Sequence, residues 1–385
     1  MKSNYKPLGK FIRLVDERNR ELEDLPLMGL SVSKVFFPTI ANLVGTDMST
    51  YKIVYKNQFT YIADTSRRGD KIAIALNEKY DKMLVSQAYT PFEVSDSNEL
   101  DPEYLMMWFR RPEFDRYARF KSHGSAREIF DWEEMCNTLL PIPSITKQRE
   151  IVKEYNVIQN RIALNQQLIQ KLEETAQAIY REWFVEGIDM ENLPEGWNIR
   201  SVYETTNFIN GAPFKESDFD IKKAGLPIIK IAELKNGIGG QTDFTLKQLV
   251  DKYKITNGDM LYSWSGNPET SLEVFKWFGG DALLNQHIFK LEFEKQHSKF
   301  FVYYLLKELK REFVRLAEGK QTTGLGHVTI ADLKELTIPY PSKQDLKKFE
   351  NIIIPFYEYD SILIKENQKL TELKELLLSR LATAE

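Results

Sequence analysis

The sequence predicts an α+β fold in which two similar α/β domains are separated by two long antiparallel helices that form a coiled coil. The segment Leu-Pro-Ile-Pro-Ser at 140–144 returns as Ile-Pro-Tyr-Pro-Ser at 338–342, 198 positions later. Each copy follows a stretch with mixed strand and helix signals. Each copy also precedes a long helix with an apolar stripe. The 385 residues are therefore explained by an internal duplication, in which one structural unit occurs twice.

This repeat divides the chain into four parts: a first domain at 1–143, a helical region at 144–187, a second domain at 188–341 and a second helical region at 342–385. In the first domain, the β-branched and aromatic residues at 51–55 predict a strand. Asp101 and Pro102 are typical of a helix start. In the second domain, a turn at Gly258 precedes an expected strand, and apolar spacing predicts one helix over 299–316. The helices at 103–119 and 300–317 correspond.

Both helical regions carry seam residues at alternating spacings of three and four, the heptad rhythm of a coiled coil. Pro355 is expected to kink or break the second helix. One asparagine in each seam can fix the register at a cost in stability, although a solvated position at the seam edge fits equally well. We expect the seam of the helix pair to contain Ile158, Ile162, Asn165, Ile169, Leu172 and Ile179, together with Phe356, Leu363, Asn367, Leu370 and Leu377.

Composition narrows the class of protein. A hydrophobic content of 42% is sufficient for folded cores, and the single cysteine, Cys136, excludes an internal disulfide framework. Neither a signal-like start nor a run of 18 apolar residues occurs, so we expect a cytoplasmic protein without a membrane span. The net charge of −4 argues weakly against nucleic-acid binding, but the distribution of charge matters more than its sum.

Common enzyme motifs are missing. The sequence has no phosphate-cradling loop, dinucleotide fingerprint, zinc helix or nucleophile elbow. Asp220, Glu233 and Lys235 imitate the metal-binding carboxylates and lysine of DNA nucleases, which would hold Mg²⁺. The alternative is a buried strand that runs into a polar loop, and the first domain has no equivalent of the pattern. We therefore expect no catalytic residue and no metal site in this chain.

Basic residues gather at equivalent places in the two domains, on a helix and on the glycine-containing loop after it. Such loops combine cations for phosphates with small polar groups for base edges. The alternative is an ordinary solvated helix face, but the repetition favours DNA binding. The candidates on these helices and loops are Arg119, Lys121, His123 and Arg127 in the first domain, and Arg311, Arg315, Lys320, Gln321, Thr322 and His327 in the second. Further candidates in expected loops are Arg67, Arg68, Lys71, Lys235, Asn236, Ser263 and Ser265.

Several segments together resemble one family. They are the Pro-x-Pro-Ser boundaries at 141–144 and 339–342, Lys-Gln-Arg-Glu-Ile-Val at 147–152, the aromatic helix end at 178–184 and Leu-Pro-Glu-Gly-Trp at 193–197. Over nearly its whole length, the chain resembles the DNA-specificity subunit of type I restriction-modification systems. The resemblance implies two target recognition domains, each reading one half of a bipartite double-stranded DNA target in the major groove. It also implies that the helices set the spacing between the half-sites.

The same resemblance implies the partners. Methyltransferase subunits would dock along the helices, and an ATP-hydrolysing restriction subunit would join them. The assembled complex would methylate adenine and cut DNA, using S-adenosylmethionine, ATP and Mg²⁺ bound by the partner subunits, while this chain itself binds no cofactor. Two alternatives remain open: a Mg²⁺-dependent DNA nuclease, and a coiled-coil scaffold that joins proteins without binding DNA.

Overall fold

The computed structural model describes residues 5–39, 45–65, 71–123, 128–293, 298–320 and 326–383. The chain forms two compact units, here called the first unit (1–163 with 369–385) and the second unit (164–368). Helix α4 (Ile145–Phe184) begins in the first unit and ends in the second, and α10 (Lys343–Arg380) runs the other way. Each unit is therefore one α/β domain with an end of each long helix. The predicted four-part division at 143, 187 and 341 stays a prediction.

The first unit is built on an antiparallel sheet of order β2-β9-β6-β7 (Ile12–Leu14, Thr90–Val94, Phe59–Tyr61, Ile74–Leu76). Beside it lie the strand pairs β5–β8 (Lys52–Tyr55, Lys82–Val85), β3–β4 (Met28–Leu30, Phe36–Pro38) and β1–β10 (Tyr5–Pro7, Leu139–Pro141). Its helices are α1 (Pro102–Phe109), α2 (Pro112–Lys121) and α3 (Trp132–Asn137). As predicted, Asp101 caps α1, accepting from the backbone N–H groups of Glu103 and Tyr104.

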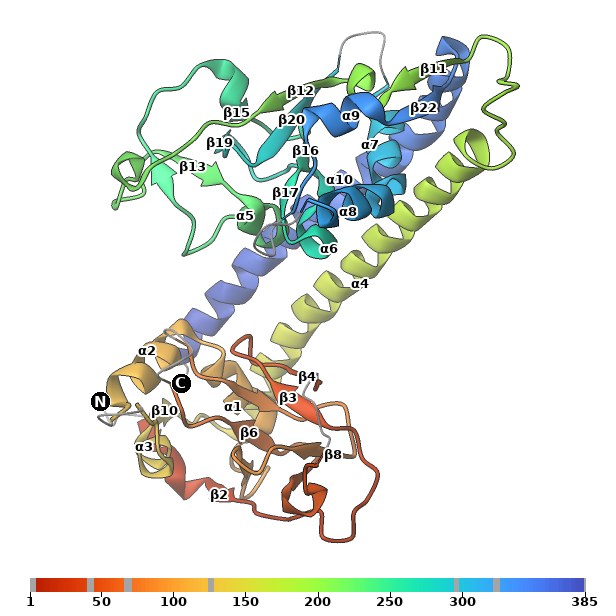
Figure 1. Cartoon of the computed structure of the whole chain (residues 1–385). Helices are drawn as coiled ribbons and strands as arrows, with labels where there is room; N and C mark the ends of the chain where they lie inside the picture. The colour runs from red at the N-terminus through yellow and green to blue at the C-terminus, as the bar shows by residue number, and fades with distance from the viewer. Residues whose placement is uncertain are drawn as a thin grey trace. The chain divides into compact units, whose positions relative to one another are not determined.

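The second unit repeats this plan. Its main antiparallel sheet has the order β12-β20-β16-β18 (Asn207–Asn210, Ile288–Glu292, Met260–Ser263, Glu273–Lys276). A second sheet has the order β14-β13-β19-β15 (Phe244–Thr245, Leu226–Ile229, Ala282–Leu284, Lys254–Ile255), and two further pairs are β11–β22 (Asn198–Ser201, Thr337–Tyr340) and β17–β21 (Ser265–Gly266, Gly326–His327). The helices are α5 (Ile231–Asn236), α6 (Pro268–Ser271), α7 (Lys299–Glu308), α8 (Lys310–Glu318) and α9 (Ile330–Glu335), as Figure 1 shows. The equal strand order of the two main sheets confirms the duplication.

The prediction of a single helix in each domain was wrong, because each is two helices. In the first unit, Pro112 forces Arg111 into an extended conformation (ψ 137°), so α1 ends before α2 begins. In the second unit, the same break falls at Leu309 (ψ 1°) without a proline. The break in the second unit therefore has no proline to predict it.

Pro355 lies inside α10, which continues past it. A helical proline lacks an N–H group and leaves the carbonyl of the residue four positions earlier, here Asn351, without its partner. Both residues are exposed, so water can hydrate that carbonyl. Pro355 therefore does not break the helix, and the other expectation, a kink at this position, stays a prediction.

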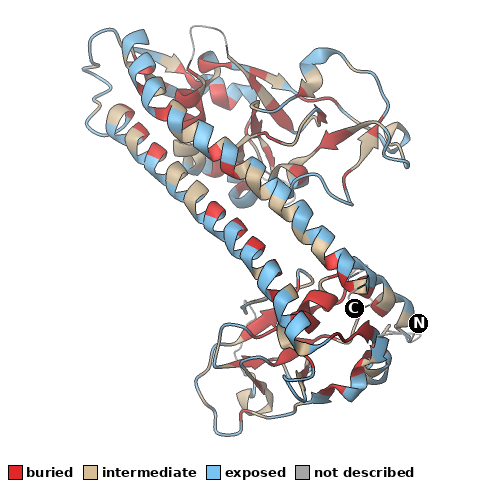
Figure 2. Cartoon of the chain, turned by 180° about the vertical axis from the view of Figure 1, so that it is seen from behind, coloured by how far each residue is buried: buried red, intermediate tan, exposed pale blue. Residues whose placement is uncertain are grey.

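Within each unit, the long helices contribute to the core of the domain. In the second unit, Phe184 of α4 packs edge-on against Phe301 of α7 (5.1 Å between ring centroids) and Phe349 of α10 (5.0 Å). In the first unit, Tyr155 of α4 and Leu378 of α10 join the domain core. Figure 2 shows buried residues recurring along both helices, between exposed ones. Because a fully buried large side chain stabilises by about 1.5–3 kcal/mol, each domain is firmly attached to its helix ends.

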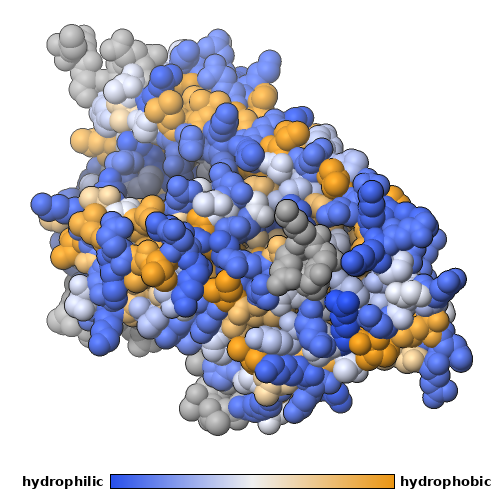
Figure 3. Space-filling model, turned by 90° about the horizontal axis from the view of Figure 1, so that it is seen from above, coloured by the Kyte–Doolittle hydropathy of each residue, from blue (hydrophilic) through white to orange (hydrophobic). Residues whose placement is uncertain are grey.

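Outside the cores the surface is mixed. On the face shown in Figure 3, hydrophilic side chains surround several separate apolar groups. Among the helices of the described residues, none is both long and apolar enough to cross a membrane.

Candidate nucleic-acid interface

A basic hollow lies on α8 of the second unit. It has a volume of about 880 Å³, and five cationic side chains line it against three glutamates. Arg311 and Arg315, both predicted DNA contacts, are exposed here. Arg315 pairs with Glu312 one turn earlier on the same helix, which orients its guanidinium without removing it from solvent. The remaining cations of the hollow are Arg181, Lys307 and Lys310.

The next described element after α8 is β21, which pairs with β17. Lys320 is exposed and pairs with Asp332 of α9, while His327 is half-buried in β21 and faces Ser265 of β17 in register. Gln321 and Thr322 lie outside the described residues. The predicted basic helix and the predicted histidine are therefore neighbours, because α8 packs against β21.

The first unit places its basic residues in the same topological position. Arg119 of α2 pairs with Glu128, and Lys121 with Glu134 at 3.3 Å. His123 is exposed, and its backbone bridges to Ile129. This is the counterpart of the β21 return in the second unit. Lys71 is also exposed. Arg67, Arg68 and Arg127 lie outside the described residues.

Two of the predicted contacts need correction. Ser263 is fully buried and Ser265 is only 5% exposed, because their strands run through the interior of the domain. Neither hydroxyl is presented to a ligand on the surface. Between them, Trp264 is half-buried. Lys235 and Asn236 are exposed, as expected, at the end of α5.

The nuclease-like carboxylates have local structural partners. Asp220 accepts from the backbone N–H groups of Lys222 and Ala224 at 3.2 and 2.6 Å. Glu233 is buried and accepts from the backbone of Lys230 (3.0 Å) and from the hydroxyl of Thr242 (3.2 Å), capping α5. Across the described ranges, no group of three potential ligands is arranged to hold a metal ion. The nuclease alternative is not favoured.

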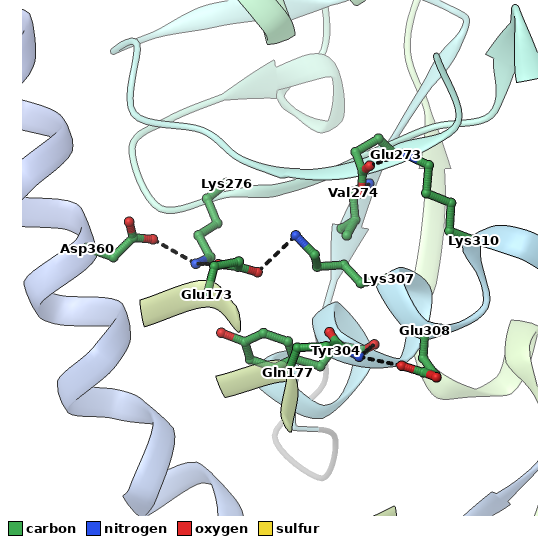
Figure 4. Close-up of polar contacts among 10 residues, drawn as sticks. All are labelled: Glu173, Gln177, Glu273, Val274, Lys276, Tyr304, Lys307, Glu308, Lys310 and Asp360. Carbon is green, nitrogen blue, oxygen red and sulfur yellow. Dashed lines mark hydrogen bonds and ion pairs between the residues drawn. The ribbon is translucent and has the colours of Figure 1, made fainter. Parts of the chain in front are cut away.

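An ion cluster, here called the anchoring cluster, joins the second domain to both long helices. Lys276 of β18 lies 2.7 Å from Glu173 of α4 and 2.7 Å from Asp360 of α10, and Lys307 of α7 lies 3.1 Å from Glu173 (Figure 4). Burial alone would raise the pKa of Glu173, but Lys276 and Lys307 lower it below its usual value. Burial raises the pKa of Asp360, although Lys276 opposes this. The cluster stabilises one orientation of the domain on the helices of its unit.

Further polar contacts surround this cluster. Gln177 of α4 donates to Glu308 at 2.7 Å, and Lys310 pairs with Glu273 (Figure 4). Arg181 of α4 also donates to Glu308, at 2.6 Å. Sequence reasoning missed this network, and Asp360 is not among the residues that it singled out. A buried acid in an apolar seam needs a cation nearby, and an aspartate in the heptad pattern was the signal from which such a partner could have been predicted.

The seam contains a buried asparagine contact. Asn165 is 1% exposed and donates to Asn367 and Glu366, each at 3.0 Å. The contact pairs an asparagine of each long helix, and the solvated alternative for Asn165 is excluded. Among the other predicted seam residues, Ile158, Ile162 and Leu363 are buried, while Ile169, Leu172, Ile179, Phe356, Leu370 and Leu377 are half-buried.

Comparisons with known proteins agree with this architecture. The family model of the type I restriction modification DNA specificity domain matches residues 34–174 and 194–375. The chain thus belongs to the family of DNA-specificity subunits of type I restriction-modification systems.

Individual relatives are distant in sequence. The type I restriction enzyme MjaIX specificity subunit of Methanocaldococcus jannaschii is 21% identical, over 74% of this chain and 68% of its own. The HindI specificity subunit of Haemophilus influenzae is 20% identical over 90% of both chains. The crystal structure of the S subunit from M. genitalium shares the fold, with a TM-score of 0.54, 15% identity and coverage of 98% of this chain and 95% of that one.

Proposed function

We propose that this chain reads a bipartite double-stranded DNA target, one domain for each half-site, and leaves catalysis to partner subunits. The observation that carries the proposal is the repeated main sheet. The main sheets of the two units have the same strand order, and each unit carries a basic helix, α2 or α8. The residues that flank α2 differ from those that flank α8. A scaffold that is kept while its contact residues diverge suits the reading of two different sequences.

The basic hollow of α8 and the corresponding basic residues of α2 are the surfaces that we propose to bind DNA. Guanidinium groups bind phosphate oxygens through paired hydrogen bonds, and these contacts position a protein on the duplex. The α/β domains would then bring their polar loops to base edges in the major groove.

The partners we propose are methyltransferase subunits and an ATP-dependent restriction subunit. These partners would bind S-adenosylmethionine, ATP and Mg²⁺. Apolar side chains exposed on both long helices support protein docking there, since exposed apolar groups often mark interfaces. They are Val157 and Leu164 on α4, and Ile352, Tyr359, Ile362, Leu373 and Leu376 on α10.

The proposal is tested with the chain purified together with its methyltransferase. We expect selective binding to, and methylation of, DNA that carries one split sequence. A folded complex that binds all sequences equally, or binds none, would contradict the proposal. The protein-scaffold alternative predicts instead that reversing the charge of Arg311 and Arg315 leaves function intact.

The nuclease alternative has its own test. The isolated chain is incubated with Mg²⁺ and supercoiled plasmid, with Glu233→Ala as the comparison. We expect no cleavage by either protein. Cleavage by the wild-type chain that disappears in the variant would establish the nuclease and remove our proposal of a chain without catalysis.

The helices are proposed to set the gap between half-sites. Deleting one heptad from α4 and the matched heptad from α10 shortens each helix by about 10.5 Å, at about 1.5 Å per residue. That length corresponds to about three base pairs at about 3.4 Å each. The preferred gap should therefore shorten by about three base pairs, measured by methylation of targets with graded spacers. Deletion from one helix alone is the control, and it should misalign the pair.

A further inference from the structure

A small group of polar and aromatic side chains lies at one end of the main sheet of the second unit. We call it the Trp264 cluster: Asn210 at the end of β12, Trp264 after β16, His287 before β20 and His327 in β21. The ring of Trp264 lies 5.7 Å from that of His287 and 5.8 Å from that of His327. Asn210 and His287 are exposed, and the other two are half-buried. Four separate segments therefore bring hydrogen-bonding groups to one place on the surface.

Trp264 is held firmly. Its ring stacks on Phe289 (5.6 Å between centroids), and its carbonyl accepts from the backbone of Val328 at 2.9 Å. Its indole Nε1–H donates to Oδ1 of Asn210 at 3.2 Å. An indole N–H can only donate, so the oxygen of the Asn210 amide must face the tryptophan. The amide NH₂ group is then the side of Asn210 left for a ligand.

The cluster suits base edges better than phosphates. Asparagine and tryptophan are uncharged, and partial burial together with nearby His327 lowers the pKa of His287, so that ring is mostly neutral at pH 7. Cations for phosphates are carried by α8, which bears the exposed Arg311 and Arg315 and packs against β21. This separates positioning contacts from base contacts, as in other DNA-binding proteins.

We infer that Asn210, oriented by Trp264, is a specificity-determining residue of the second domain and reads a hydrogen-bond acceptor on a major-groove base edge. Guanine, with acceptors at both O6 and N7, fits the exposed NH₂ group best. Cytosine presents a donor there and is rejected. Asparagine usually binds adenine through two hydrogen bonds, for which it needs both its NH₂ group and its amide oxygen. Because Trp264 already occupies the oxygen of Asn210, this paired contact is less favourable here. This inference rests on the proposed function of the chain in reading DNA.

The test uses the complex with its methyltransferase and compares methylated sites in cells by sequencing, with binding to randomised half-sites in vitro. Asn210→Asp replaces the donor with an acceptor. We expect one position of one half-site to lose its preference for guanine by roughly ten- to a hundredfold, in favour of cytosine. The other half-site should stay unchanged.

Trp264→Phe is the second variant, because it keeps an aromatic ring on Phe289 but removes the indole N–H. The amide of Asn210 can then turn, so guanine and adenine should be accepted more equally at that same position. Asn207→Asp is the matched control, since Asn207 is exposed at the other end of β12, and it should leave the target unchanged.

The results distinguish the role of Asn210 from the proposed reading of DNA by the whole chain. A folded Asn210→Asp complex that keeps the full wild-type target overturns the inference but leaves the proposed function standing. A wild-type complex without any sequence preference overturns both.

Discussion

Replacing Lys276 with methionine should destabilise the second unit by roughly 3–5 kcal/mol, the usual cost of removing one partner from a buried ion pair. Lys276 is the cation shared by Glu173 and Asp360, both at 2.7 Å. Methionine fills similar space, so lost packing contributes little. The cost arises because carboxylates are left in a poorly hydrated site without their counter-charge.

The cost should fall mainly on Asp360. Its side chain is 4% exposed and Lys276 is its ion-pair partner in the cluster, whereas Glu173 is 19% exposed and keeps Lys307 at 3.1 Å. Adding Asp360→Leu to Lys276→Met removes the stranded charge, and well-packed apolar replacements of buried ion pairs are often neutral. The double variant should therefore be more stable than Lys276→Met alone.

Hydrogen exchange measured by mass spectrometry suits this chain, because two units need not unfold in one step. Peptides from β18 and α7 should lose roughly a hundredfold or more of their protection in Lys276→Met, while peptides of the first unit stay unchanged. The matched control is Lys171→Met, which removes an exposed ion pair with Glu174 on the same helix as Glu173 and should shift stability by no more than about 1 kcal/mol.

Additive effects of the two substitutions on stability would contradict the proposed coupling between Lys276 and Asp360. If the effects of Lys276→Met and Asp360→Leu simply sum to within about 0.5 kcal/mol, the two residues are not coupled and the cluster does not anchor the domain.

Three further predictions concern separate parts of the chain. Replacing Arg311 and Arg315 with glutamate should weaken binding to all DNA sequences alike and reduce the salt slope by about two, measured by fluorescence anisotropy at graded salt. Replacing both Asn165 and Asn367 with leucine should raise the stability of the helix pair but loosen its register, detected as oligomers by light scattering. Asp101→Ala should cost about 1 kcal/mol in urea unfolding of the first unit, because α1 loses its cap.

Sequence reasoning reached the features that are local or periodic. The heptad spacing predicted the seam through Asn165 and Asn367, and the Asp101–Pro102 pair predicted the start of α1. The break at Leu309 could not be predicted in this way, because no proline or glycine marks it in the sequence.

Features that depend on distant residues were missed or misplaced. Asp360 and Lys276 are 84 positions apart, and only the fold brings them together. Ser263 was expected in a loop, yet it lies in the fully buried β16. Asn210 was missed because its role depends on Trp264, 54 residues later.

The most direct test of the central claim is a comparison of methylated sites, by sequencing, in cells that carry this chain and in cells whose chain has residues 188–341 replaced by the matching domain of a relative. Two independent reading domains predict that one half of the split target changes while the other half and the modified base stay the same. A target that is unaltered, or altered throughout, would contradict the assignment of one domain to each half-site.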